Sequence, residues 1–150
     1  MYNKKEKQLI KDFVKSINPE LKIFYQEIFE CDIYEEEIFI GKKEFTSDTR
    51  MFMEWFQKEF PLCKDCHWWL ISLLHEIGHV ETYEEVKHDK REIIYSILKM
   101  AFEMGDVSIV KLNNAYFNLP AEYDATYWAA SYYLSNTDKC NALLSQLDVK

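Results

Sequence analysis

The chain has 150 residues, a length that fits one domain with a buried core. It is 48% hydrophobic, and 18 Lys and Arg stand against 26 Asp and Glu, a net charge of −8. The hydrophobic share excludes a disordered chain, and the acidity argues against general nucleic-acid binding, which depends on cations that displace phosphate counterions. Because no apolar signal opens the chain and no run approaches the ~20 residues of a membrane span, we expect a cytoplasmic protein without a membrane partner.

The predicted elements begin with an amphipathic helix over residues 4–17. β-Forming residues dominate residues 21–45, where we expect two or three antiparallel strands with turns near Glu30–Asp32 and Gly41–Lys43. The acidic run Glu35–Glu37 is expected along a solvent-exposed edge of this small sheet, where its charge would discourage pairing with another sheet.

From residue 47 onward the hydrophobic periodicity is helical. The sequence therefore predicts a single α+β domain over residues 1–150, with a small early sheet packed against a mainly helical core. The predicted helix from about His88 to Met104 carries its apolar residues on one face and should stop at Gly105. The predicted helices run from Ser47 or Asp48 to Phe60, from about Asp65 to Glu81, from about His88 to Met104, from Pro120 to about Leu134, and from about Asp138 to Leu147.

The four cysteines, Cys31, Cys63, Cys66 and Cys140, are expected as free thiols in a reducing cytoplasm. The segment Cys63-Lys64-Asp65-Cys66-His67 matches the attachment pattern of c-type haem, but covalent attachment needs export, and no export signal is visible. A structural zinc site would need a second Cys or His pair at similar spacing, which the sequence lacks. We therefore interpret the segment as a turn that leads into a buried helix.

The segment His75-Glu76-Ile77-Gly78-His79 carries the strongest chemical signal. On a helix, residues four apart lie on one face, so the nitrogens of His75 and His79 can share one Zn²⁺ at ~2.0–2.1 Å. Glu76 lies beside the pair, where its carboxylate can contact a metal-bound water without binding the metal. The preceding residues 68–74 are almost wholly apolar, which predicts a buried helix whose polar groups need a partner such as a metal. Gly78 leaves room for close packing or for a substrate.

A catalytic zinc ion needs a third protein ligand and an open position for water. His67 lies eight residues before His75, ~12 Å along a continuous helix, and His88 lies among charged residues, so the spacing of neither histidine fits. Two carboxylates, Glu122 and Asp124, are better candidates. They lie on the predicted helix that starts at Pro120, whose several alanines would allow it to approach the histidine helix closely.

The two motifs together resemble the ImmA/IrrE family of metallopeptidase-like proteins, over about residues 65–135. In that family the second motif reads Glu-x-Glu-Ala-Asn-x-Phe-Ala, and here Glu122-Tyr123-Asp124-Ala125-Thr126-Tyr127-Trp128-Ala129 stands in its place. The family's third ligand is the acid directly before the first Ala, so the resemblance implies a zincin-like fold with Asp124 as third ligand. Asp124 is one methylene shorter than the family's Glu, and Glu122 is the alternative ligand. Thr126 stands where the family has Asn.

The resemblance implies a zinc-dependent peptidase that hydrolyses a peptide bond in a specific protein, such as a repressor in phage or mobile-element control. Glu76 would act as general base toward a metal-activated water, and a Tyr or His would hold the oxyanion. The strand at Ile38–Ile40 could pair with an extended substrate, although ordinary sheet structure is the favoured interpretation. The alternative function is a weakly active or inactive, metal-stabilised module that binds a protein and regulates it.

Overall fold

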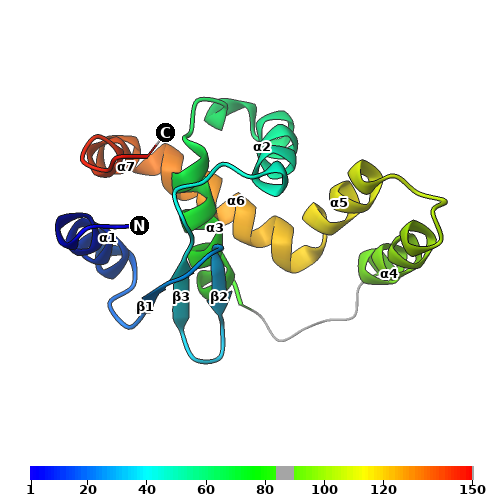
Figure 1. The fold of residues 1–150 in the computed structure, drawn as a ribbon, viewed down its shortest axis with the longest axis horizontal. Helices are drawn as coiled ribbons and strands as arrows, with labels where there is room; N and C mark the ends of the chain where they lie inside the picture. Colours follow the sequence, from blue (N-terminus) through cyan, green and yellow to red (C-terminus); the bar gives the residue numbers. More distant parts are fainter. Residues whose placement is uncertain (84–89, 150) are drawn as a thin grey trace.

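The computed structural model describes residues 1–83 and 90–149 and has the predicted α+β class, with a mainly helical architecture (Figure 1). No described helix is both long and apolar enough to cross a membrane. The elements are α1 (Lys4–Ile17), β1 (Lys22–Tyr25), β2 (Glu30–Asp32), β3 (Glu37–Ile40), α2 (Ser47–Glu59), the 3-10 helix η1 (Pro61–Cys63), α3 (Trp68–Glu81), α4 (Lys90–Glu103), α5 (Ile109–Phe117), α6 (Pro120–Ser135) and α7 (Thr137–Leu144).

Side-chain caps fix where the predicted helices start. In α1, the side chains of Asn3 and Glu6 form a capping box with each other's backbone N–H groups. At the start of α3, Nδ1 of His67 accepts a hydrogen bond from the backbone N–H of Trp69 at 3.2 Å. This cap moves the start of α3 from the predicted Asp65 to Trp68 and gives His67 a structural role.

The three strands form a mixed sheet in the order β1-β3-β2, so the prediction of a purely antiparallel sheet is wrong. β3 pairs in parallel with β1 and antiparallel with β2. β3 therefore lies between the other two strands, with a partner at each edge. Its residues Ile38 and Ile40 are fully buried. The residues predicted as a turn, Glu30–Asp32, are strand β2 instead.

The acidic run Glu35–Glu37 does not lie along a sheet edge as predicted. Glu35 and Glu36 belong to the turn between β2 and β3, and Glu36 has a left-handed backbone with φ 53°. Glu37 is already the first residue of the central strand, where Lys22 of β1 lies 3.5 Å from its carboxylate. The charges therefore mark a tight reversal of the chain.

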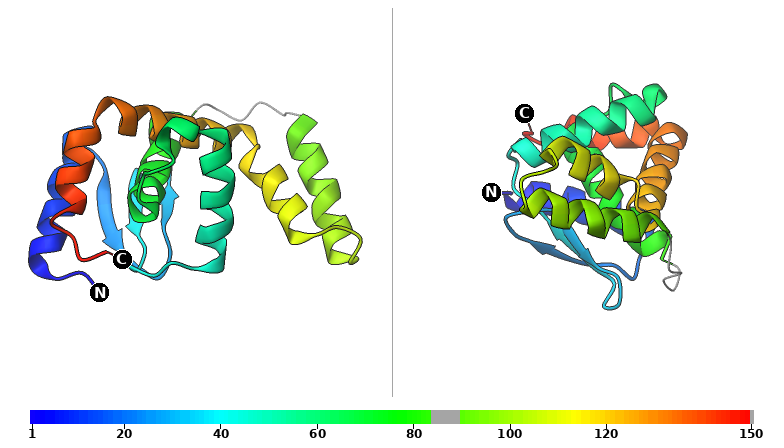
Figure 2. Two further views of the ribbon diagram at one scale, coloured as in Figure 1. Left: turned by 90° about the horizontal axis from the view of Figure 1, so that it is seen from above. Right: turned by 90° about the vertical axis from the view of Figure 1, so that its right-hand side faces the viewer.

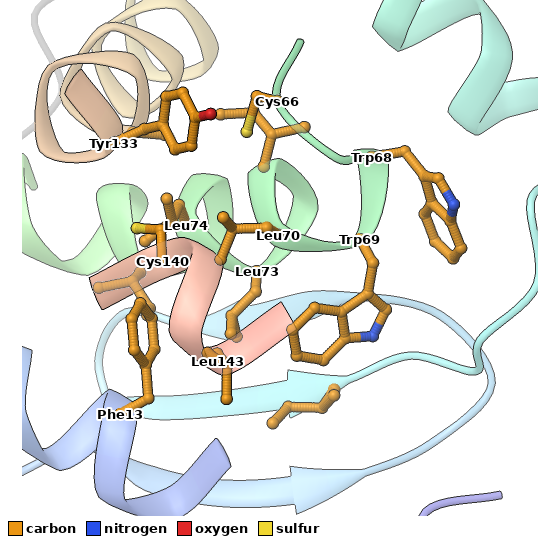
Figure 3. Close-up of a cluster of buried hydrophobic side chains, with 14 of the residues drawn as sticks. Phe13, Cys66, Trp68, Trp69, Leu70, Leu73, Leu74, Tyr133, Cys140 and Leu143 are labelled. Carbon is orange, nitrogen blue, oxygen red and sulfur yellow. The ribbon is translucent and has the colours of Figure 1, made fainter. Parts of the chain in front are cut away.

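The core is organised around α3, which is buried as predicted. Trp69, Leu70, Leu73 and Leu74 have no exposed surface and gather with residues of α1, α6 and α7 in one cluster (Figure 3). Full burial of a large aliphatic side chain is worth about 1.5–3 kcal/mol, so several such residues fix α3 firmly. α3 packs against α6 and against β2 and β3, which makes it a rigid support for the residues at its C-terminal half.

The helices α4 and α5 form a hairpin that projects from the rest of the chain (Figure 2). α5 was not predicted, because it is only nine residues long and its start depends on a side-chain cap by Ser108. α4 stops at Gly105 as predicted, with φ 83°, but no residue of its described length is buried. Its predicted apolar face is exposed, with Ile93 at 64% and Ile97 at 60%. The predicted start of this helix at His88 lies outside the described residues.

The cysteine segment forms the predicted turn ahead of a buried helix. The backbone N–H of Cys66 donates to the carbonyl oxygen of Cys63 at 2.9 Å, and both side chains are buried. All four cysteines are free.

Candidate metal centre

Three side chains from two helices converge at the C-terminal half of α3. Nε2 of His75 and Nε2 of His79 lie 3.1 Å apart, and Oε2 of Glu122 on α6 lies 3.2 Å from the first and 3.4 Å from the second. This is the group within the described residues whose donor atoms are arranged to hold a metal ion.

The spacing of these atoms fits one shared ion. Ligand atoms at ~2.0–2.1 Å from an ion in a tetrahedral arrangement lie about 3.3 Å from one another. The three separations, 3.1, 3.2 and 3.4 Å, bracket this value. Two imidazole nitrogens and one carboxylate oxygen therefore form three corners of a tetrahedron around a single point. The donor set can hold a divalent ion without a rearrangement of either helix.

Gly78 is the residue that lets α6 come this close. A Cβ atom at Gly78 would lie 2.4 Å from the carbonyl oxygen of Ala125, so the two helix backbones are in direct contact there. Ala125 follows Glu122 by three residues and shares its helix face. The contact between Gly78 and Ala125 thus brings the Glu122 side chain within 3.2–3.4 Å of the two histidines. Of the two roles that the sequence allowed for Gly78, the structure shows close packing.

Asp124, the predicted third ligand, does not lie in this group, and the alternative Glu122 does. Two residues apart on a helix correspond to about 200° of rotation, so the two carboxylates point in opposite directions. Asp124 is exposed and lines a separate surface hollow beside Thr82 and Trp128. The correction follows from helical phase, because only Glu122 shares a face with the buried Ala125 and Ala129.

Thr126 fixes the protonation pattern of His75. Its hydroxyl donates to the carbonyl oxygen of Glu122 at 2.8 Å, and its oxygen lies 3.0 Å from Nδ1 of His75. Because the hydroxyl proton is already used, Nδ1 of His75 must be the donor, which leaves the lone pair of Nε2 for the metal position. Thr126 therefore orients the His75 ring in the way that outer partners orient metal-bound histidines.

Glu76 lines the same cleft as His75 and Glu122, and the thiol of Cys31 on β2 donates a hydrogen bond to its carboxylate. Burial raises the pKa of Glu76, and the charge of Glu122 adds to this effect, while His75, His79 and the Cys31 thiol oppose it. Burial and the neighbouring carboxylates raise the pKa of Cys31, which keeps it a protonated donor. No pattern in the sequence pointed to Cys31, which lies more than forty residues before the histidines.

Tyr116 of α5 completes the surroundings of Glu122. Its phenol donates to Oε1 of Glu122 at 2.8 Å. Burial, followed by the charge and the hydrogen bond of Glu122, raises the pKa of this phenol well above its ordinary value. The sequence could not select Tyr116 from ten tyrosines, because α5 itself had no clear periodicity.

A cleft of about 460 Å³ opens directly beside His75, Glu76 and Glu122. Its rim carries the carboxylates of Glu27, Glu44 and Asp48 against the single ammonium of Lys42, which is ion-paired with Glu27. Its walls are largely apolar: Ile28, Phe29, Phe52, Trp68, Ile109 and Phe117.

The strand nearest to the site is β2 rather than the segment Ile38–Ile40, because the residues directly before β2, Glu27 to Phe29, line the cleft and Cys31 of β2 contacts Glu76. The segment Ile38–Ile40 lies in the central strand β3, which pairs with β1 at one edge and β2 at the other and so cannot accept a substrate strand. This agrees with the favoured interpretation of the segment as ordinary sheet structure. β2 is an edge strand that packs on α3, and within the described residues no strand pairs with its outer edge.

The surroundings of His79 raise its pKa above the ordinary histidine value. Burial alone would lower the pKa of His79, but the hydrogen bond and charge of Glu122, followed by the charge of Glu76, outweigh it and raise this pKa. In turn, burial alone would raise the pKa of Glu122, but His75 and His79 outweigh it and hold it well below its usual range. Without a metal, protonation of His79 and ionisation of Glu122 therefore favour each other.

We expect metal affinity to fall on acidification, beginning above the ordinary histidine pKa of ~6.5, because protons compete for His79. The loss should approach about tenfold per pH unit for each proton displaced. Without metal, stability should change in the opposite sense: the raised pKa of His79 adds stability that is full below ~6.5 and disappears as pH rises through the folded-state value. Chelator competition and thermal melting from about pH 5 to about pH 8 measure both trends, and a flat affinity profile would contradict the assignment of His79 as ligand.

Comparison of the chain with protein-family models, with curated proteins and with solved structures finds no match.

Proposed function

We propose that the protein is a zinc-dependent peptidase related to the ImmA/IrrE-like metallopeptidases, acting on a specific protein target. The observation that carries this proposal is the convergence of two imidazole nitrogens and one carboxylate oxygen, with the carboxylate of Glu76 outside this group but lining the same cleft. Structural zinc sites use four protein ligands, whereas catalytic sites use three and leave one position open. Three ligands from the described residues fit the catalytic pattern.

In the proposed hydrolysis, three residues would hold the metal and Glu76 would transfer the proton. A zinc ion held by His75, His79 and Glu122 would supply Lewis acidity and lower the pKa of water toward ~7. Glu76 takes the proton of the attacking water and returns it to the leaving amine. The pKa of Glu76 is raised by its burial, which suits a group that must both accept and donate a proton near neutral pH.

The cleft suits an extended peptide with apolar and basic side chains. Its walls offer aromatic and aliphatic side chains, while three carboxylates against one ammonium make its rim acidic. The edge strand β2 lies beside Glu76 through the contact of Cys31, so a peptide added to that edge would pass the catalytic carboxylate. We therefore propose a substrate segment that is extended, with an apolar side chain near the scissile bond and a basic residue close by.

The function is tested by replacing the proposed base. We expect Glu76→Gln to bind zinc with nearly wild-type stoichiometry and to lose about 10²–10⁴-fold in cleavage rate, because general base catalysis contributes a factor of this size. The assay combines metal analysis of the purified protein with mass spectrometry of a peptide library digested by the zinc-loaded protein.

The matched control is Glu81→Gln, which removes a carboxylate at the exposed C-terminal end of the same helix, where it accepts a hydrogen bond from Asn18. It should leave cleavage unchanged. If the wild-type protein binds zinc but cuts nothing, or if Glu76→Gln cuts as fast as wild type, the peptidase proposal fails, and the metal-stabilised binding module takes its place.

A further inference from the structure

The two oxygens of Glu122 have different partners. Oε2 faces the histidines, at 3.2 Å from Nε2 of His75 and 3.4 Å from Nε2 of His79. Oε1 accepts a hydrogen bond from the phenol of Tyr116 at 2.8 Å. The carboxylate is thus divided between a metal-facing oxygen and an oxygen held by a neutral donor.

Tyr116 comes from a part of the fold separate from the ligand helices. It lies on α5, and its ring contacts that of Tyr95 on α4 with 5.7 Å between the centroids. The side chain also lines the cleft beside His75 and Glu76. α5 ends at Phe117 and leads directly into α6, which starts at Pro120 (Figure 1). Tyr116 thus lies just before the helix that carries Glu122 and donates to it from the preceding helix.

A carboxylate can bind a metal through one oxygen or through both. If both oxygens of Glu122 bound, they would occupy a position that catalysis needs for water or substrate. A hydrogen bond to a charged carboxylate is stronger than one between neutral groups. A carboxylate oxygen that accepts such a bond is therefore less available to bind the metal.

We propose that Tyr116 is a positioning residue that holds Oε1 of Glu122 and thereby keeps this ligand bound through Oε2 alone. The inference rests on the metal site of the proposed function, and it assigns Tyr116 a role in coordination geometry. It makes the α4–α5 hairpin part of the centre, because the hairpin supplies the donor that the two ligand helices lack.

The test is Tyr116→Phe, which removes only the hydroxyl group. We expect its affinity for Zn²⁺, measured by chelator competition, to fall about 10–100-fold, as for the loss of other outer partners of metal ligands. We also expect the visible absorption of the Co²⁺-loaded variant to weaken and change shape relative to wild type, because a second bound oxygen raises the coordination number. Neither readout depends on peptidase activity.

The matched control is Tyr123→Phe. Tyr123 is the chain neighbour of Glu122, but its hydroxyl donates to Glu59 at 3.0 Å, away from the metal group. This variant should keep the wild-type affinity and the wild-type Co²⁺ spectrum.

An unchanged Co²⁺ spectrum in Tyr116→Phe overturns the inference, whether or not the affinity falls, because Tyr116 would then not control how Glu122 binds. Failure of the peptidase proposal gives a different result: a wild-type protein that binds Co²⁺ and shows the spectral change on Tyr116→Phe, yet cleaves no peptide.

Discussion

Replacing Glu122 by Gln is expected to weaken zinc binding by about 10²–10³-fold or more. Structural zinc sites with four ligands bind with about 10–16 kcal/mol, so one ligand accounts for about 2.5–4 kcal/mol, and each 1.4 kcal/mol is a factor of ten. Gln has nearly the shape of Glu, and the variant keeps the hydrogen-bonding capacity toward Tyr116 in part. The loss therefore reports the metal-binding oxygen, which competition with a chromogenic chelator measures.

Asp124→Asn is the matched control, because it changes the other acid of the same helix in the same way. The side chain of Asp124 is exposed and points away from the histidines, so metal affinity should stay within about twofold of wild type. The reverse outcome, with metal lost from Asp124→Asn and retained by Glu122→Gln, would mean that α6 is rotated relative to the packing described above.

Glu122→Gln should also change the stability of the metal-free protein. Glu122 is the main cause of the raised pKa of His79, so its removal should lower that pKa. The stability that the metal-free protein gains below ~6.5 from the raised pKa of His79 should then decrease. Thermal melting of the metal-free variant at mildly acidic pH measures this change.

Gly78→Ala is expected to destabilise the protein by about 2 kcal/mol and to weaken metal binding as well. The added Cβ would lie 2.4 Å from a backbone oxygen of Ala125, and backbone cannot move aside as a flexible side chain can. Overpacking costs about 1–3 kcal/mol, and a backbone clash belongs at the upper end, while the gain in helix propensity returns at most ~1 kcal/mol. Denaturant unfolding and zinc affinity together measure the effect.

Gly105→Ala separates a general loss of stability from an effect on the site. Gly105 has φ 83° at the end of α4, and nothing lies within 4 Å of the position of an added Cβ atom. That variant should lose stability through backbone strain but keep the zinc affinity of wild type. If Gly78→Ala binds zinc as tightly as Gly105→Ala does, the close helix contact does not position Glu122.

The His75 and His79 pair could be predicted because its geometry is local. A helix fixes the relation between residues four apart, and the apolar residues 68–74 make α3 form and become buried. For the same reason the sequence places Glu76 beside the pair without knowledge of the rest of the fold.

The third ligand depends on how two helices pack, which local spacing does not contain. Matching Asp124 to a family motif took no account of helical phase, and in the structure the buried Ala125 and Ala129 share their helix face with Glu122. The exposed face of α4 shows the same limit, since periodicity reports that a helix is amphipathic but not what covers its apolar side.

The sequence by itself determined the α+β class, the main helices and the paired histidines with Glu76, because these follow from hydrophobic periodicity and helix geometry within a few residues of chain. Only the tertiary structure decided that Glu122 faces the histidines, that Tyr116 holds its other oxygen, and that Cys31 contacts Glu76. The contacts of Glu122 with the histidines and of Cys31 with Glu76 join residues more than forty positions apart, and Tyr116 contacts Glu122 from a different helix. The place of Glu122 also depends on the contact between Gly78 and Ala125, where one helix lies directly on another.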